Sequence, residues 1–139
     1  MEKLVDLVEE ECIPCNSDMT PLTPVEYEPY MAQLEDWIIE EEKMLVKTWR
    51  FRNFEIPMDF ANKITVIAEA AGHHPDLYIR WGELSAFIWT HKINGLSKSD
   101  FILAAKIDRA YDEMNYFDKL VPKEPETEGV ETIVEVETD

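Results

Sequence analysis

The spacing of apolar and polar residues changes several times along the chain, and each change marks an expected element. In residues 57–71, Phe60, Ile64 and Ile67 recur every three or four positions, which places them on one face of a helix. Residues 44–54 alternate from face to face and are rich in aromatic and β-branched types, which is typical of a strand. The pattern predicts helices over 24–34, 57–71 and 98–120, and strands over 37–41, 44–54, 77–81 and 83–91.

Local signals set the expected ends of these helices. Thr23 and Glu26 form a capping box at the start of the first helix, where Thr23 caps and Glu26 reaches back. Gly72 ends the second helix, because glycine readily takes the left-handed backbone found after a last helical turn. Ser97 caps the third helix, with Asp100 in the position where the same motif prefers Glu or Gln.

The last expected strand is apolar on both of its faces. Leu84 and Ile88 point to one side, whereas Phe87 and Trp89 point to the other. A small protein that buries both faces of a strand needs helices on one side and another cover opposite, such as a second copy of the chain or a paired sheet edge. The order helix, two strands, helix, two strands, helix predicts an α+β fold.

The chain divides into one expected domain with two acidic ends. Residues 1–22 carry six acids and one lysine, and residues 121–139 carry seven acids and one lysine. We interpret 1–22 as an extension, 23–120 as the folded domain, and 121–139 as an acidic tail that favours disorder. The net charge of -17 argues against binding to nucleic acid or to anionic membranes. The absence of a long apolar run and of a secretory signal predicts a cytoplasmic protein.

Cys12 and Cys15 form a single C-x-x-C motif in the extension. A zinc ribbon needs two such pairs or additional histidine ligands, and the surrounding residues do not resemble a redox motif between a strand and a helix. Reduced thiols in a mobile segment and a partial or intermolecular metal site both stay open.

The three histidines of the chain are His73, His74 and His91. If the last two strands form a hairpin around Gly82, His91 returns to the neighbourhood of the adjacent pair, so the sequence predicts one cluster. Imidazoles titrate near neutral pH, so such a cluster suits general acid–base catalysis. A metal site is the main competitor, although neighbouring histidines chelate poorly on regular structure and no carboxylate stands at a familiar ligand spacing. Structural or capping histidines are a third reading.

These residues, taken with others around them, resemble the signature of the pterin-4a-carbinolamine dehydratase family. The signature is an acid, three residues, a His-His-Pro core, an aromatic residue, a further His or Trp, and a later Asp. The matching positions are Glu69, His73, His74, Pro75, Asp76, Trp81, His91 and Asp100. The resemblance covers roughly residues 20–120, because Trp37 and residues 48–54 also resemble the first hairpin of the family.

The resemblance implies a fold and a reaction. The fold is a four-stranded antiparallel sheet with helices packed on one face, assembled as a homodimer or homotetramer. The reaction is the dehydration of a 4a-hydroxytetrahydropterin to the quinonoid dihydropterin, in the recycling of tetrahydrobiopterin. The substrate is left by aromatic amino-acid hydroxylases, which would be pathway partners. The family uses no metal and no organic cofactor.

The resemblance also implies roles for individual residues. His73 and His91 match the catalytic histidines and would act as base and acid, in an order that the sequence leaves open. His74 would bind and orient the pterin. Trp37 and Pro75 would form walls of the site. Glu69 would contact the pterin ring or orient a histidine. Asp100 would either orient a histidine or cap a helix.

Two positions depart from the family pattern, and two other functions compete with dehydration. Leu77 stands where members often have an aromatic residue, and Ser99 stands where some have a basic one, so pterin stacking could differ. One rival function is a non-enzymatic interaction protein that stabilises the dimer of a transcription factor. The other is a non-catalytic pterin-binding relative in molybdopterin or folate metabolism.

Overall fold

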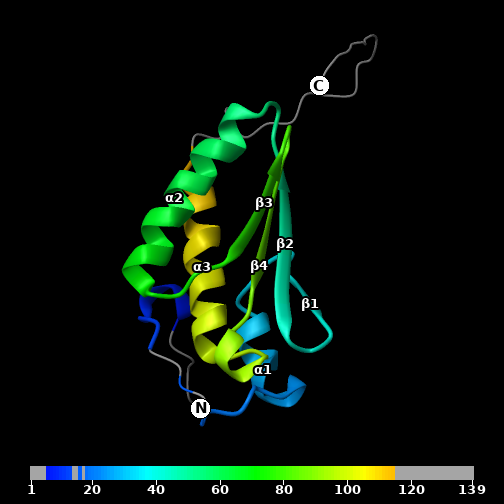
Figure 1. Ribbon diagram of the computed structural model, residues 1–139, viewed down its shortest axis with the longest axis vertical. Helices are drawn as coiled ribbons and strands as arrows, with labels where there is room; N and C mark the ends of the chain where they lie inside the picture. Colours follow the sequence, from blue (N-terminus) through cyan, green and yellow to red (C-terminus); the bar gives the residue numbers. More distant parts are fainter. Residues whose placement is uncertain (1–5, 14–15, 17, 115–139) are drawn as a thin grey trace.

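Four antiparallel strands form one sheet, and helices α2 and α3 cover one of its faces (Figure 1). The computed structural model describes residues 6–13, 16 and 18–114. The strand order is β1-β2-β4-β3, which confirms the predicted α+β class and sheet. The elements are η1 (Leu7–Glu9), α1 (Pro24–Met31), β1 (Ile38–Glu40), β2 (Met44–Arg50), α2 (Glu55–Ala71), β3 (Asp76–Arg80), β4 (Glu83–Ile88), η2 (His91–Ile93) and α3 (Lys98–Asp112).

The core lies between the sheet and the two long helices. Alternation along β2 and β4 turns Leu45, Trp49, Leu84 and Ile88 toward the helices, where each is at most 4% exposed. Phe60 of α2 packs edge-on against the ring of Trp49, at 5.0 Å between ring centroids. Burying such a side chain contributes about 1.5–3 kcal/mol, so this layer fixes how the helices sit on the sheet.

The opposite face of the sheet carries apolar side chains that no described helix covers. We call this the outer face and define it by Ile38, Val46, Tyr78 and Phe87, which the strand register places on the same side. Ile38 and Tyr78 are 55% and 56% exposed. The expected cover of this side by a second copy of the chain or by a paired sheet edge stays a prediction.

Several element ends differ from the sequence-based expectation. Strand β4 ends at Ile88 instead of reaching residue 91, because Thr90 bridges to Gly95 and closes a short loop that contains η2. Helix α2 begins at Glu55, two residues before the expected Pro57, because Asn53 Oδ1 accepts a hydrogen bond from the amide of Ile56. At the other ends, α1 stops at residue 31, β2 at residue 50 and α3 at residue 112, while residues 115–120 lie outside the described chain.

Part of the expected N-terminal extension packs on α3. Leu7 is 1% exposed, and the Lys106 Nζ donates to the carbonyl of Val8 at 3.0 Å. The thiol of Cys12 lies 3.5 Å from the carbonyl oxygen of Ser99. Residues 7–13 are thus a docked segment. Cys15 and the predicted acidic tail over 121–139 lie outside the described residues.

Candidate functional site

The three histidines line one cavity, as their positions in the sequence predicted. The cavity has a volume of about 450 Å³ and is formed by residues 72–76 and 89–92. It lies where the C-terminal end of α2, the start of β3 and the loop after β4 meet. Pro75 lines it as well, so this expected wall residue is in place.

Chain geometry explains why these two segments meet. Gly72 ends α2 in the left-handed conformation, with φ 66°, and turns the chain directly into His73 and His74. In the β3–β4 hairpin, Asp76 pairs with Phe87, so the start of β3 lies beside the end of β4. His91 follows within the next few residues and therefore reaches the same cavity.

His73 is held by a buried carboxylate. Its Nε2 lies 2.5 Å from Oδ1 of Asp100, whose side chain is fully buried, while the His73 side chain is 14% exposed. A carboxylate can only accept, so Nε2 carries a hydrogen, and in the neutral imidazole Nδ1 is then the nitrogen with the lone pair. This is the arrangement that prepares a histidine to act as a base, because the carboxylate also stabilises the imidazolium that forms.

Asp100 performs both of the roles that the sequence left open. Its other oxygen, Oδ2, accepts hydrogen bonds from the backbone amide of Ser97 and the hydroxyl of Thr90, each at 2.8 Å. The first of these bonds belongs to the predicted capping box of α3. One carboxylate therefore caps a helix with Oδ2 and orients His73 with Oδ1.

The other two histidines have more open surroundings. His74 Nε2 lies 2.8 Å from Glu69 Oε2, and the two side chains are 59% and 70% exposed. Glu69 therefore contacts a histidine, as expected, although the pair is screened by solvent. His91 is exposed and packs edge-on against Trp89, with ring centroids 4.3 Å apart. His91 has room to approach a ligand in the cavity.

Trp37 does not line the histidine cavity, in contrast to the expectation. It is 5% exposed, and its Nε1 donates to both oxygens of Asp108 on α3, at 3.0 and 3.1 Å. The physical reason is its position just before β1, which points the indole into the core against Trp49. We therefore leave Trp37 out of the group that would contact a substrate.

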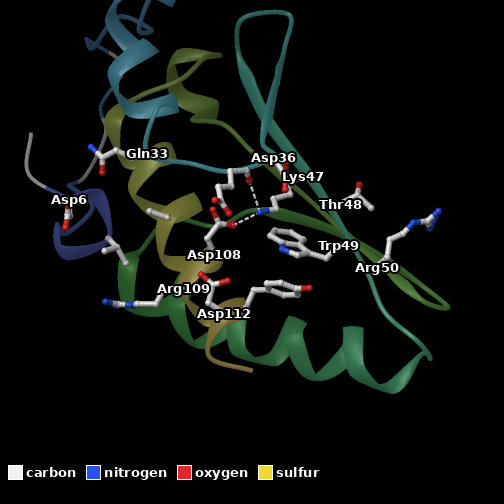
Figure 2. Close-up of a pocket in the computed structure, with 14 residues that line it drawn as sticks. Asp6, Gln33, Asp36, Lys47, Thr48, Trp49, Arg50, Asp108, Arg109 and Asp112 are labelled. Atoms are coloured by element: carbon white, nitrogen blue, oxygen red, sulfur yellow. Dashed lines mark hydrogen bonds and ion pairs between the residues drawn. The ribbon is translucent and has the colours of Figure 1, made fainter. Parts of the chain in front are cut away.

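A second, larger cavity lies beside Asp108 and differs from the histidine cavity in the residues that line it (Figure 2). It has a volume of about 950 Å³ and lies between β2 and α3. Lys47 Nζ donates to Asp108 at 2.9 Å and to the backbone oxygen of Glu35 at 2.8 Å. Burial raises the pKa of Asp108 above its ordinary value, and hydrogen bonds from Lys47 and Trp37 partly oppose that rise. No histidine lies in this cavity.

Sequence reasoning missed several residues of the histidine site, among them Lys92. Thr90 and Trp89 both line the cavity, and neither was expected there. The position of Thr90 directly before His91 was the only available signal, and it does not reveal a bond to a residue on another element.

Within residues 6–13, 16 and 18–114, no group of three or more His, Cys, Asp or Glu is arranged to hold a metal ion. None of the helices there is both long and apolar enough to cross a lipid bilayer.

Comparisons with known proteins identify the family of the chain. The profile of the family described as "Pterin 4 alpha carbinolamine dehydratase" matches residues 20–110. Proteins named "Putative pterin-4-alpha-carbinolamine dehydratase" are similar over about three quarters of the chain. The one from Rickettsia canadensis (strain McKiel) is 50% identical over 103 residues, which cover 73% of this chain and 94% of the relative. The one from Rubrobacter xylanophilus is 43% identical over 104 residues, covering 75% and 97%.

A solved structure supports the fold. The crystal structure described as a transcriptional coactivator/pterin dehydratase from Brucella melitensis matches with a TM-score of 0.61 at 22% identity, covering 66% of this chain and 98% of that one. At this identity the likeness concerns the fold alone. The family profile and the sequence relatives decide membership: this chain belongs to the pterin 4 alpha carbinolamine dehydratase family.

Proposed function

We propose that the protein dehydrates 4a-hydroxytetrahydropterins by histidine acid–base catalysis. Family membership supports a pterin dehydratase, and the arrangement of His73 supports the mechanism. The observation that carries the proposal is the bond from the buried Asp100 to His73, which lines one cavity together with His74 and His91.

The proposed reaction needs one proton removed and one delivered. His73 Nδ1 takes the proton from N5 of the pterin, and the electron pair left on N5 forms the N5=C4a double bond. The C4a–O bond breaks, and His91 gives its proton to the departing oxygen, which leaves as water. The products are water and the quinonoid dihydropterin, and exchange with solvent resets both histidines.

The assignment of His73 as base follows from its surroundings. Protonation of His73 creates an imidazolium next to the Asp100 carboxylate, where it is stabilised by charge and hydrogen bonding. Within the described residues His91 contacts the ring of Trp89 and no carboxylate, and its exposure gives it access to protons from solvent. His74, paired with Glu69, would bind the ring, and Pro75 would form a wall.

The proposal extends to cofactors, location and pathway. Both proton transfers are within the capacity of imidazoles, so we propose that no metal or organic cofactor takes part and that chelators leave the rate unchanged. The substrate is the product left when aromatic amino-acid hydroxylases transfer oxygen. The protein would therefore serve tetrahydrobiopterin recycling in the cytoplasm.

The apolar outer face supports a homo-oligomer. Ile38 and Tyr78 would be covered if a second copy packed there or along the adjacent sheet edge. Light scattering coupled to gel filtration would distinguish monomer, dimer and tetramer. A wild-type protein that stays monomeric at micromolar concentration contradicts this part of the proposal.

A spectrophotometric assay with synthetic 4a-hydroxytetrahydropterin tests the activity. We expect the wild-type protein to accelerate the dehydration above buffer, and we expect His73→Ala and His91→Ala each to lower kcat by about 10²- to 10⁴-fold. Circular dichroism must show that both variants remain folded. If folded wild-type protein gives no acceleration, the chain is a non-catalytic relative and the proposal is wrong.

A further inference from the structure

We propose that Thr90 is a positioning residue for the dehydration and that Ser97 assists it. Together their hydroxyl groups hold the Asp100 carboxylate in the orientation that keeps the hydrogen on Nε2 of His73. The inference rests on the proposed function and extends it to side chains that would not touch the reacting atoms.

The direction of each hydrogen bond around Asp100, from donor to acceptor, can be assigned. Thr90 Oγ1 donates its one hydrogen to Asp100 Oδ2 at 2.8 Å. The contact of 2.9 Å between Thr90 Oγ1 and Ser97 Oγ must then be donated by Ser97, whose hydroxyl also lies 3.5 Å from Asp100 Oδ2. The hydrogen bonds run from the Ser97 hydroxyl to the Thr90 hydroxyl, and from Thr90 to the Asp100 carboxylate. The same carboxylate also accepts a hydrogen bond from His73.

Because these residues are buried, their hydrogen bonds determine how the Asp100 carboxylate is oriented. The Asp100 side chain is fully buried, and Thr90 and Ser97 are 4% and 3% exposed, so water cannot readily replace a lost donor. With Oδ2 held by the Thr90 hydroxyl and the Ser97 amide, Oδ1 is the oxygen that faces His73. Removal of the Thr90 hydroxyl leaves Oδ2 with the Ser97 amide and the more distant Ser97 hydroxyl, so the carboxylate is held less firmly toward the imidazole.

Thr90 also connects the proposed base with the proposed acid. Its backbone amide donates to the carbonyl of Gly95 at 2.8 Å, which closes the loop that carries His91. Its side chain meanwhile bonds to the carboxylate that holds His73. Thr90 therefore helps to position both proposed catalytic histidines relative to each other. Its loss should lower kcat more than it weakens substrate binding.

The test uses three threonine variants. Thr90→Val keeps the shape and removes the hydroxyl, whereas Thr90→Ser restores the hydroxyl. Thr48→Val is the matched control, because Thr48 Oγ1 forms a hydroxyl pair with Ser85 at 2.6 Å on a different part of the sheet. We expect Thr90→Val to lower kcat tenfold to a hundredfold with KM within about threefold. We expect Thr90→Ser and Thr48→Val to keep kcat within about threefold of the wild type.

A second measurement does not depend on turnover. The hydrogen on His73 Nε2, held against a buried carboxylate at 2.5 Å, should give a far-downfield proton resonance. We expect this resonance to shift or broaden in Thr90→Val and to persist in Thr90→Ser and Thr48→Val. A purely structural role for Thr90 would change stability without changing this signal.

The outcomes separate the two proposals. A folded Thr90→Val protein with wild-type kcat and an unchanged resonance overturns the inference, and so does loss of activity that Thr90→Ser fails to restore. If wild-type protein lacks dehydratase activity, the proposed function fails, and the resonance alone still decides whether Thr90 holds the Asp100–His73 pair.

Discussion

Two aspartates about two turns apart on α3 have opposite kinds of partner. Asp100 lies behind the histidine cavity, where it binds His73 and accepts from the neutral donors of Thr90 and Ser97. Asp108 binds Lys47 and the indole of Trp37, in a cavity without a histidine (Figure 2). Imidazole is the side-chain type that suits proton transfer, whereas an ammonium group suits a lasting ion pair.

Neither the size of a cavity nor the presence of a buried carboxylate identifies the proposed site of proton transfer in this fold. The cavity at Asp108 is about twice as large as the one at the histidines. Its Lys47 is 11% exposed and lies over the rings of Trp37 and Trp49, which makes it a packed ion pair. The comparison predicts that changes around Asp100 affect mainly turnover, and changes around Asp108 affect mainly stability.

The largest expected effect is that of Asp100→Asn. The amide places a donor group beside His73 and favours the wrong tautomer, so kcat should fall by about 10³-fold, similar to such changes in catalytic triads. Loss of the cap should also lower the free energy of unfolding by about 1 kcal/mol. Kinetics and urea denaturation would measure both. The control Asp108→Asn should retain kcat, and equal losses of kcat in the two variants would abolish the distinction between the sites.

Lys47→Met should destabilise the protein without abolishing turnover. It leaves the Asp108 carboxylate partly buried without its cation, which should cost about 3 kcal/mol at pH 7. Burial already raises the pKa of Asp108, and loss of Lys47 raises it further, so the cost should shrink as the pH falls through that raised value. Urea denaturation at pH 7 and at about pH 4 measures the change. The control is Lys63→Met, which changes a lysine on the exposed side of α2. If the loss in free energy of unfolding caused by Lys47→Met did not depend on pH, the role given to the buried Asp108 would be contradicted.

Trp37→Phe sharpens the assignment of Trp37 to the core. The change removes the donor to Asp108 and keeps an aromatic ring, so the free energy of unfolding should fall by about 1–2 kcal/mol. KM for the pterin should stay within about twofold, because Trp37 does not line the histidine cavity. Steady-state kinetics checks this. A tenfold rise in KM would mean that Trp37 reaches the substrate in the assembled protein.

The smallest expected effect is that of Glu69→Gln. The bond between Glu69 and His74 is more than half exposed, so its loss should cost less than about 0.5 kcal/mol. KM should rise by about twofold to fivefold if the pair orients the pterin, and added salt should reduce the difference from the wild type. A fall in kcat as large as that of Asp100→Asn would place Glu69 in the proton transfer.

Much of this architecture follows from local signals. The capping box of Thr23 with Glu26 and that of Ser97 with Asp100 are both present, and Gly72 ends α2 in the expected conformation. The hairpin around Gly82 brings His91 back toward the other histidines, as its sequence position indicated. Such signals are readable because they depend on neighbours within a few positions along the chain.

Other features depend on contacts between distant residues. His73 meets Asp100 across 27 positions, and Trp37 meets Asp108 across 71. Periodicity tells which face of an element is buried, but it does not say which side chain on another element will be its partner. The burial of Trp37 against Asp108, and the bond from Thr90 to Asp100, were therefore beyond sequence reasoning.

By itself, the sequence determined the order of the elements, the helix caps and the meeting of three histidines, because backbone preferences and hydrophobic periodicity act locally. Only the tertiary structure decided that Asp100 on α3 both caps the helix and holds His73, and that Asp108 holds a lysine. That choice depends on the packing of α3 against the sheet, which sets the few ångströms over which hydrogen bonds form.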